Sequence, residues 1–329
     1  MRSKDYIPDF KSIFNNELTD FIKFKRSCGY VYGRANTSMS KLMDNFFISQ
    51  KMSYKMVNQD MYDSWMNTMV TFTDSTRARY HSAMSSFCEY LRMLGYEEVI
   101  QPESLRLKYK SDFIPYVFNT IELERMFNQM AKNIQLNKDD INSKDFYVLF
   151  CLYYGCGLRL SEGLNLRKEN YDYESNTLHI IESKNNVSRL IPLSISISTQ
   201  LEVLLSLKGI DEHIFFSAVK RSTAKQMVYD CYHNLLKVSK IPIRYDGKRQ
   251  RIHDLRHTFA INALKQMEDK GFDLYTSLPI LSVYLGHKTI TETEYYLRLV
   301  EKEENNVTKK VYDYMINLYK QKEEFYEEE

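Results

Sequence analysis

One segment of this 329-residue chain restricts its fold and chemistry more than any other. Residues 251–260 read Arg-Ile-His-Asp-Leu-Arg-His-Thr-Phe-Ala, so that two imidazoles and the guanidinium of Arg256 fall on about one helical turn. A Leu-Gly-His triplet that ends at His287 follows, and then a tyrosine pair that ends at Tyr296. A cationic cluster followed by a phenol indicates an anion held by fixed donors beside a weak oxygen nucleophile. This combination favours phosphoryl transfer.

A third motif lies well upstream. Residues 155–162 read Gly-Cys-Gly-Leu-Arg-Leu-Ser-Glu, in which the two glycines permit a tight turn before a helix. The order Gly-x-Gly-Leu-Arg-Leu-Ser-Glu, His-Asp-Leu-Arg-His-Thr, Leu-Gly-His and Tyr resembles the tyrosine recombinase (phage integrase) family over most of residues 150–300. Each motif alone is a weak signal, whereas all three in this order are specific.

The resemblance implies a mostly α-helical protein with a small β-sheet or hairpin, built as a two-domain clamp around a DNA duplex. A helical core-binding domain is expected over residues 1–108, a linker over 109–118, and a mixed α+β catalytic domain with a C-terminal helical tail over 119–329. The length of the chain also suggests two domains, each with its own core. Prolines and charges replace the apolar periodicity around the expected linker.

Local patterns predict several elements directly. Apolar residues recur at helix spacing in four runs before residue 95, and further helices are predicted over 144–153 and 222–240. Residues 177–193 alternate as a hairpin does, with Ile181 and Leu190 among the side chains that should face one another. An extended loop is expected from Met267 to Pro279. The compact Xer-type recombinases have a shorter connection there, so the loop favours a recombinase of a mobile element.

The resemblance assigns the central catalytic roles. Arg159 and Arg256 are expected to hold the non-bridging phosphate oxygens, because two guanidinium forks match that geometry. Tyr296 is expected to attack phosphorus and form a 3′-phosphotyrosine, which stores the bond energy so that neither ATP nor a metal or other cofactor is needed. Lys184 is the expected general acid toward the 5′ oxygen. A second lysine, often found in this turn of the family, is Val187 here.

Supporting roles fall to the remaining polar residues of the motifs. His253 is expected to assist proton transfer, and His287 to donate to the phosphate or orient the phenol. Glu162 is expected to orient a catalytic Arg or His, and His257 to be a buried structural histidine. Tyr295 adjoins Tyr296 and is a rival nucleophile, although the spacing from the Leu-Gly-His triplet favours Tyr296.

The expected partner is double-stranded DNA, bound by a homo-oligomer, as a tetramer. Basic residues near helix ends in the first domain and just before residue 252 are candidates for phosphate contacts, which position DNA without reading it. For any single residue of the first domain a solvated surface is the simpler explanation, and for the basic run before residue 252 the two explanations are equal. These candidates are Lys23, Lys25, Arg26, Arg34, Arg77, Arg79, Arg249 and Arg251. The tail beyond Asn306 has an apolar stripe that packs either on its own domain or on a neighbouring protomer.

Charge and composition agree with a DNA-binding protein inside the cell without demanding one. The formal net charge is +2, but residues 301–329 hold nine acidic residues against five lysines, so the remainder of the chain is more basic. The five cysteines are odd in number and form no Cys-x-x-Cys pair, which favours reduced thiols. No signal-peptide core follows Met1, and no apolar run is long enough to cross a bilayer. A cytoplasmic protein without membrane contact is therefore expected.

Other functions fit the same residues less well. His253 and His257 have the i, i+4 spacing of helical zinc ligands, but a zincin has Glu after the first His, where this chain has Asp254. Arg256 between the two imidazoles would also repel a cation. A catalytically silent DNA-binding accessory protein remains an alternative, although all the expected catalytic side chains are present. A type IB topoisomerase and an Xer-like resolvase of chromosome or plasmid dimers share the constellation.

Overall fold

The computed structural model describes residues 6–103, 115–181, 188–209, 213–244, 246–287, 289–294 and 296. The chain divides into two compact units, Met1–Phe113 and Ile114–Glu329, each with its own internal contacts. Lys184, Tyr295 and the tail beyond Asn306 lie outside the described residues. Among the residues described, no helix is both long enough and apolar enough to span a bilayer.

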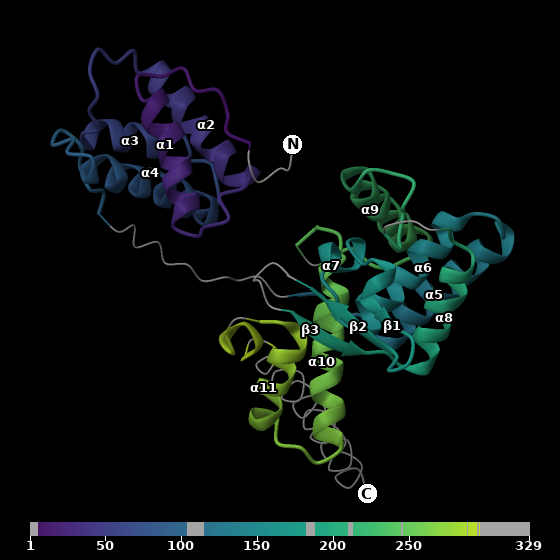
Figure 1. Cartoon of the computed structure of the whole chain (residues 1–329). Coiled ribbons are helices and arrows are strands. Elements are labelled where there is room, and N and C mark those ends of the chain that lie inside the picture. Colours follow the sequence, from purple (N-terminus) through teal and green to yellow (C-terminus); the bar gives the residue numbers. More distant parts are fainter. Residues whose placement is uncertain are drawn as a thin grey trace, which may run out of the picture. The chain divides into compact units, whose positions relative to one another are not determined.

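The first unit contains four described helices: α1 (Asn15–Ser27), α2 (Arg34–Ser49), α3 (Gln59–Asn67) and α4 (Asp74–Met93). The four runs predicted from periodicity are thus confirmed as helices (Figure 1). Their inward faces meet in an aromatic core, where the ring of Phe14 lies 4.7 Å from that of Phe47 and 5.7 Å from that of Phe87. Burial of such large apolar side chains supplies most of the stabilisation of a small helical unit.

The second unit is built around α6 (Ile141–Gly155), a helix with apolar residues on nearly all sides. It packs against α5 (Thr120–Leu136), α8 (Ile195–Ser206) and α10 (His253–Asp269), and α5 packs in turn on α9 (Arg221–Val238). A helix that is hydrophobic all round is stable only when other elements cover it. Burying α6 at the centre holds its C-terminal end, and with it the Gly-x-Gly turn at residues 155–157, in a fixed place.

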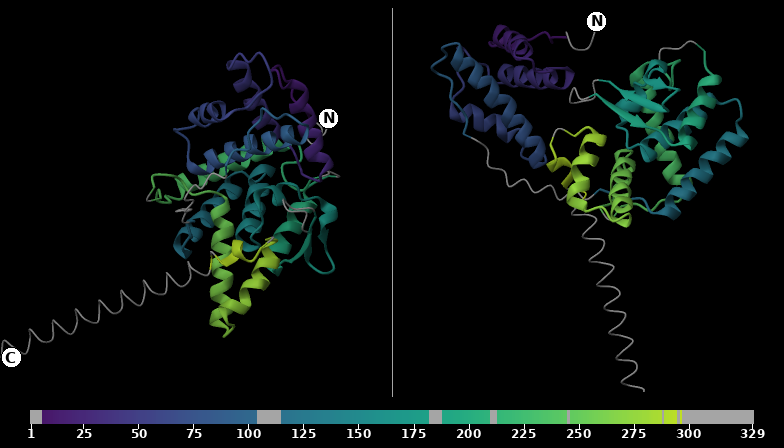
Figure 2. Two further views of the ribbon diagram at one scale, coloured as in Figure 1. Left: turned by 90° about the vertical axis from the view of Figure 1, so that its left-hand side faces the viewer. Right: turned by 60° about the horizontal axis from the view of Figure 1, so that its bottom comes forward.

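A three-stranded antiparallel sheet of order β1-β2-β3 lies beside these helices (Figures 1 and 2). Its strands are β1 (Tyr171–Asp172), β2 (Thr177–Ile180) and β3 (Arg189–Pro192), with Leu178 opposite Ile191. The predicted hairpin strands are therefore confirmed. The expected facing of Ile181 and Leu190 is not found, because Leu190 lies opposite His179 and Ile181 lies just past the end of β2. Side chains alternate along a strand, and the buried face here consists of Leu178, Ile180 and Ile191.

The α10 helix and α11 (Leu274–Leu285) pack side by side as an antiparallel pair (Figures 1 and 2). The extended loop expected between residues 267 and 279 is wrong, because α10 continues to Asp269 and Pro279 lies inside α11. The connection is short because Gly271 adopts the left-handed conformation (φ 82°) and Asp273 caps α11 by accepting a hydrogen bond from the amide of Thr276. The remaining short helical segments are α7 (Leu160–Leu164) and the 3₁₀ turn η1 (Lys168–Asn170).

Candidate active site

Arg159 and Glu162 form the base of the site at the start of α7. The backbone amide of Arg159 donates to Glu162 Oε2 (2.8 Å), which caps the helix, and Arg159 Nη1 donates to Glu162 Oε1 (2.8 Å). Arg159 Nη2 donates to the carbonyl of Gly286 (2.9 Å). The motif Gly-Leu-Arg-Leu-Ser-Glu therefore spaces the two residues so that one carboxylate holds both the backbone and the side chain of the arginine.

Arg256 projects from the first turn of α10 into the same place and is 1% exposed. Its Nη1 donates to the carbonyl of Gly157 and its Nη2 to that of Leu285, both at 2.6 Å. Burial, together with the charge of Arg159, lowers the pKa of Arg256 to about 10. The guanidinium is therefore still cationic at neutral pH, and two positive side chains from distant parts of the chain meet at one site.

Tyr296 lies against this cluster and is 2% exposed. Its hydroxyl shares a hydrogen bond with Nδ1 of His257 (2.9 Å), and its ring lies nearly parallel to that of His287, 6.4 Å away between centroids. Arg256 Nη2 contacts His287 Nε2 at 3.1 Å, so the phenol and the guanidinium lie on the same imidazole. The phenol and the cations thus meet as expected from the sequence.

The orientation of His287 follows from its two neighbours. Arg256 Nη2 lies 3.1 Å from His287 Nε2, and since a guanidinium has no acceptor, Nε2 accepts and Nδ1 carries the proton. The Nδ1–H then donates to the hydroxyl of Thr293 (2.8 Å). Donation from His287 to a phosphate, which the sequence predicts, therefore requires that Arg256 releases Nε2 when DNA binds.

All three imidazoles of the site are held neutral. Burial lowers the pKa of His257 to about 2 and, with Arg256 next, that of His287 to about 3. His253 opens onto a cleft, yet desolvation of its ring and the charges of Arg256 and Arg251 lower its pKa to about 4. The rings of His253 and His257 meet edge to face, 4.6 Å apart between centroids. Neutral imidazoles leave the positive charge of the site on its arginines.

The ionised carboxylate of Glu162 offsets part of this positive charge. Burial opposes its ionisation, but hydrogen bonds and charge from Arg189 and Arg159 outweigh that effect and lower the pKa of Glu162 to about 2. Arg189, the first residue of β3, donates to both carboxylate oxygens of Glu162 at 3.0 and 2.9 Å. The sequence predicted a supporting role for Glu162 but gave none to Arg189. Its place after the hairpin turn, before an apolar-Pro-Leu ending, was the available signal.

A second supporting carboxylate was also missed. Asp254 is fully buried, accepts from the amide of Arg251 (2.7 Å) and from Arg251 Nη2 (3.2 Å), and lies 3.7 Å from Arg244 Nη1. It thereby fixes the start of α10, from which His253 and Arg256 project. A carboxylate three residues after the amide that it accepts from is the signature of a capping interaction, and the sequence carries that spacing.

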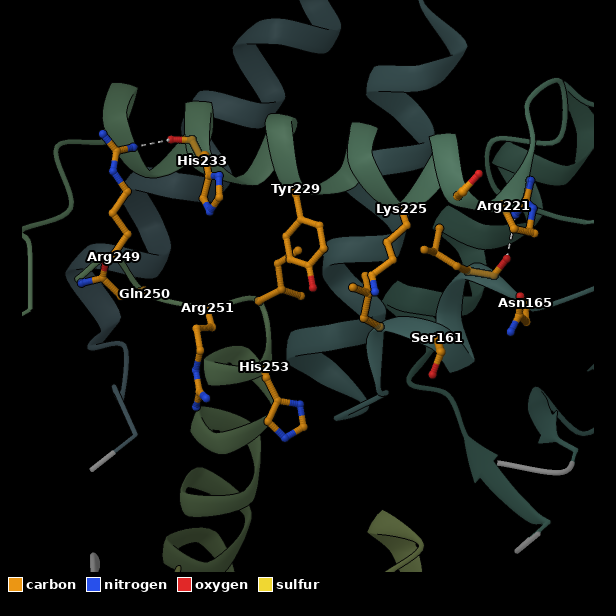
Figure 3. A pocket seen from close by; sticks show the side chains of 14 residues that line it. Ser161, Asn165, Arg221, Lys225, Tyr229, His233, Arg249, Gln250, Arg251 and His253 are labelled. Atoms are coloured by element: carbon orange, nitrogen blue, oxygen red, sulfur yellow. Dashed lines mark hydrogen bonds between the residues drawn. The ribbon is translucent and has the colours of Figure 1, made fainter. Parts of the chain in front are cut away.

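A cleft of about 660 Å³ opens beside His253. Figure 3 shows Lys225, Tyr229 and His233 projecting from α9 towards it, with Ser161 and His253 across the opening. Arg249 and Arg251, two of the predicted phosphate contacts, line the same cleft (Figure 3). The cleft therefore joins basic side chains to the edge of the arginine and histidine cluster.

The predicted contacts in the first unit have mixed surroundings. Arg26 is engaged with the backbone, since it donates to the carbonyls of Tyr6 and Tyr32. Lys23 and Arg77 form ion pairs within their own helices, with Asp20 and Asp74. Lys25 and Arg79 line a concave surface between α1, α2 and α4, and Arg34 is exposed at the start of α2. The structure does not bring these residues to a single point.

A helical unit with a small antiparallel sheet, in which arginines and histidines surround a phenol, defines a tyrosine-type site-specific DNA recombinase. The chain belongs to the phage integrase family, whose model matches residues 118–303. The resemblance read from the three motifs is thereby confirmed.

Relatives span most of the chain. A putative integrase/recombinase of Sinorhizobium fredii is 22% identical over 87% of this chain and 93% of its own length. A tyrosine recombinase of Pseudothermotoga lettingae is 27% identical over 71% of this chain and 74% of its own. The fold is similar to that of XerH recombinase bound to palindromic difH substrate in a post-cleavage complex, with a TM-score of 0.63 and 15% identity over 92% of this chain and 90% of that one.

Proposed function

We propose that the chain cleaves and rejoins double-stranded DNA at a specific site through a covalent 3′-phosphotyrosine on Tyr296. One observation carries the proposal: the Tyr296 hydroxyl, bonded to His257, lies against a cluster that contains Arg256, His287 and Arg159. Fixed cations aimed at a phosphate stabilise the charge of a pentavalent transition state, and a phenol beside them supplies the nucleophile.

The reaction needs no net input of energy. The phenolic oxygen of Tyr296 forms a bond to phosphorus and gives up its proton to solvent, with His253 assisting that transfer as the family resemblance implies, while the bond from phosphorus to the 5′ oxygen breaks. The leaving 5′ oxygen takes a proton, for which Lys184 is the donor that the family resemblance implies. Attack by a 5′ hydroxyl of the same or another duplex reverses the sequence and releases the tyrosine. The phosphotyrosine conserves the bond energy between the two steps.

DNA must reach the buried phenol for this chemistry to occur. The exposed cleft beside His253, lined by Lys225, Arg249 and Arg251, offers a basic path for the duplex backbone. Because Tyr296 is 2% exposed, a phosphate reaches its hydroxyl only when the groups that cover the phenol move. Recombinases of similar fold are seen on DNA, among them lambda integrase (75–356) as a dimer bound to a COC′ core site, with a TM-score of 0.58 and 17% identity.

The biological setting that we propose is integration, excision or transposition of a mobile element, with a tetramer of the chain on DNA. The fold resembles the Tn1549 transposon integrase in complex with circular intermediate DNA (TM-score 0.54, 15% identity), and relatives named integrase/recombinase cover most of the chain. Dimer resolution is the second candidate, supported by a tyrosine recombinase XerA of Pyrococcus furiosus that is 28% identical over 57% of this chain. The expected long loop no longer favours the first candidate, since that segment is mostly helical.

Covalent capture tests the proposed chemistry. Full-length protein is incubated with a pool of nicked duplexes of random core sequence, in which the short strand beyond the nick diffuses away after cleavage. The wild type is expected to form a protein–DNA adduct that resists denaturation, with chelator present, whereas Tyr296→Phe forms none. Sequencing of the captured ends gives the target site. Absence of any adduct from the wild type, or an adduct that persists in Tyr296→Phe, would contradict the proposal, and dependence on a metal would favour the hydrolase alternative.

A further inference from the structure

Arg189 is bound at each of its three guanidinium nitrogens, although it touches neither Tyr296 nor the cleft in the described contacts. Nη1 and Nη2 donate to the two oxygens of Glu162, and Nε donates to the carbonyl of Tyr284 (2.7 Å). The guanidinium is 5% exposed. A planar fork can span a carboxylate and a separate carbonyl in this way, whereas an ammonium group cannot.

The turn that ends α11 shows why this placement matters. The carbonyl oxygens of residues 284, 285 and 286 accept hydrogen bonds from three different arginines, Arg189, Arg256 and Arg159 in that order, at 2.7, 2.6 and 2.9 Å. The last carbonyls of a helix have no partner within the helix and carry its negative dipole. The backbone carbonyls of residues 284–286 therefore accept hydrogen bonds from the two catalytic arginines and from Arg189, one arginine for each carbonyl.

Glu162 closes the arrangement from the other side. It binds Arg159 and Arg189 directly, and its Oε2 lies 4.0 Å from Arg256 Nη1. A Cβ atom at Gly286 would lie 3.0 Å from Arg189 Nη1, so the turn packs directly on the Arg189 side chain. Arg189 thus joins the Glu162 carboxylate to the turn that leads into His287, as Arg159 does, but from β3 rather than from α7.

We propose that Arg189 is a positioning residue of the recombinase reaction, which sets Arg159 and Arg256 for the phosphate through Glu162 and the 284–286 turn. This inference rests on the proposed function. Arg189 itself contacts no reacting atom. It begins β3, directly after the segment that contains Lys184, so the same side chain also anchors the catalytic end of the hairpin to α11. A displacement of about 1 Å in a phosphate-binding arginine reduces a rate by about 100-fold.

A purely structural role for Arg189 predicts a different outcome from a positioning role, so an experiment can distinguish the two roles. Loss of a buried charge partner destabilises any fold, so stability alone does not identify a positioning residue. Arg189→Met removes all three of these hydrogen bonds, whereas Arg189→Lys keeps the charge but cannot satisfy both Glu162 oxygens and the Tyr284 carbonyl. Lys208→Met is the matched control, because it breaks another buried ion pair of the same unit, 2.5 Å long, whose partner is Asp145.

The experiment measures cleavage of the captured target, as a nicked duplex, by folded and DNA-bound full-length protein, alongside thermal stability and DNA affinity. Both Arg189 variants are expected to bind DNA as the wild type does. Arg189→Met should form the Tyr296 adduct about 100-fold more slowly, and Arg189→Lys at least about 10-fold more slowly. Lys208→Met is expected to lose stability but keep the wild-type cleavage rate in its folded fraction. Combined with Arg189→Met, Glu162→Gln is expected to slow cleavage by less than the product of the two single effects, because the two residues share one contact although Glu162 also binds Arg159 directly.

Wild-type cleavage by Arg189→Lys, or losses in both Arg189 variants that match Lys208→Met at equal stability, would reduce Arg189 to a structural residue. Additive effects of Glu162→Gln and Arg189→Met would overturn the route through Glu162. Failure of the proposed function looks different, since the wild type itself would then form no adduct, and the role of Arg189 would fall with it.

Discussion

Nδ1 of His257 lies 2.9 Å from the hydroxyl of Tyr296. The two residues are 39 positions apart, and α10 and the segment after α11 bring them together. With a pKa of about 2, His257 is too weak a base to hold the phenolic proton, so its part is to direct the hydroxyl. The sequence predicts that His257 is a buried structural histidine beside the catalytic arginine. This contact shows that the group it holds is the hydroxyl of Tyr296.

Replacement of His257 should therefore change the rate of attack and leave DNA binding intact. His257→Leu leaves the buried Tyr296 hydroxyl without this partner, at a cost of about 1–3 kcal/mol, and is expected to slow adduct formation at least about 10-fold. His257→Asn, which keeps a polar group near the phenol, is expected to recover part of the rate. Single-turnover cleavage with saturating protein separates the two steps. Equal rates in wild type and His257→Leu would show that the contact is dispensable.

Acid stability should report the Glu162 cluster. The folded pKa of Glu162 is about 2 against an ordinary value of 4.5, so its ionisation stabilises the fold above pH 4.5, and this contribution is lost as pH falls towards 2. The difference corresponds to about 3 kcal/mol. Glu162→Gln is expected to be less stable by about that amount at neutral pH, and the gap to wild type should narrow below pH 4.5. Urea unfolding at several pH values measures it, and a gap independent of pH would refute the assignment.

Gly286 provides a test of the packing around Arg189. It adopts φ 67°, and an added Cβ would lie 3.0–3.3 Å from the Arg189 guanidinium. Gly271 is also left-handed (φ 82°), but a Cβ there meets nothing within 4 Å. Both alanine variants carry backbone strain of about 1–3 kcal/mol. Gly286→Ala is expected to be the less stable in thermal unfolding and to cleave DNA more slowly, whereas Gly271→Ala should cleave normally. Equal behaviour of the two variants would argue against the close contact.

The cleft beside His253 should bind the DNA backbone. Lys225 lines it, and Lys225→Gln is expected to weaken binding about equally for all sequences and to reduce the slope of log K against log salt by about 1. Lys132 is an exposed lysine on α5 that does not line the cleft, so Lys132→Gln is the matched control and should leave the slope unchanged. Fluorescence anisotropy over a salt series measures both. An unchanged slope in Lys225→Gln would place the duplex elsewhere.

Much of this architecture follows from local sequence rules, and the failures have identifiable causes. Helix spacing predicted all four helices of the first unit, and alternation predicted β2 and β3. The loop expected from Met267 to Pro279 was wrong because α10 continues to Asp269 and the Asp273 cap starts α11 before the proline. The pairing across the hairpin was assigned wrongly at Leu190, which lies opposite His179, since strand register depends on partners that a single sequence does not reveal.

The residues of the site also fall into two groups, those that the sequence predicts and those that it does not. Arg159, Glu162, His253, Arg256, His287 and Tyr296 lie in motifs with fixed spacing, and the structure gathers them at one place. Arg189 received no role from the sequence, because its placement depends on the carbonyl of Tyr284, a backbone atom 95 positions away. Long-range contacts to backbone groups leave no trace in residue type. Asp254 did leave one, since it stands three residues after Arg251, the spacing of a capping carboxylate.

The most direct test of the account locates the bond between protein and DNA. Adducts from the nicked-duplex reaction are digested with nuclease and protease, and the modified peptide is fragmented in a mass spectrometer. A nucleotide remnant is expected on Tyr296, joined through its 3′ phosphate, with none on the neighbouring Tyr295. A remnant on Tyr295, on another residue, or joined through a 5′ phosphate would contradict the claim that the arginine cluster and Tyr296 act on one DNA phosphorus.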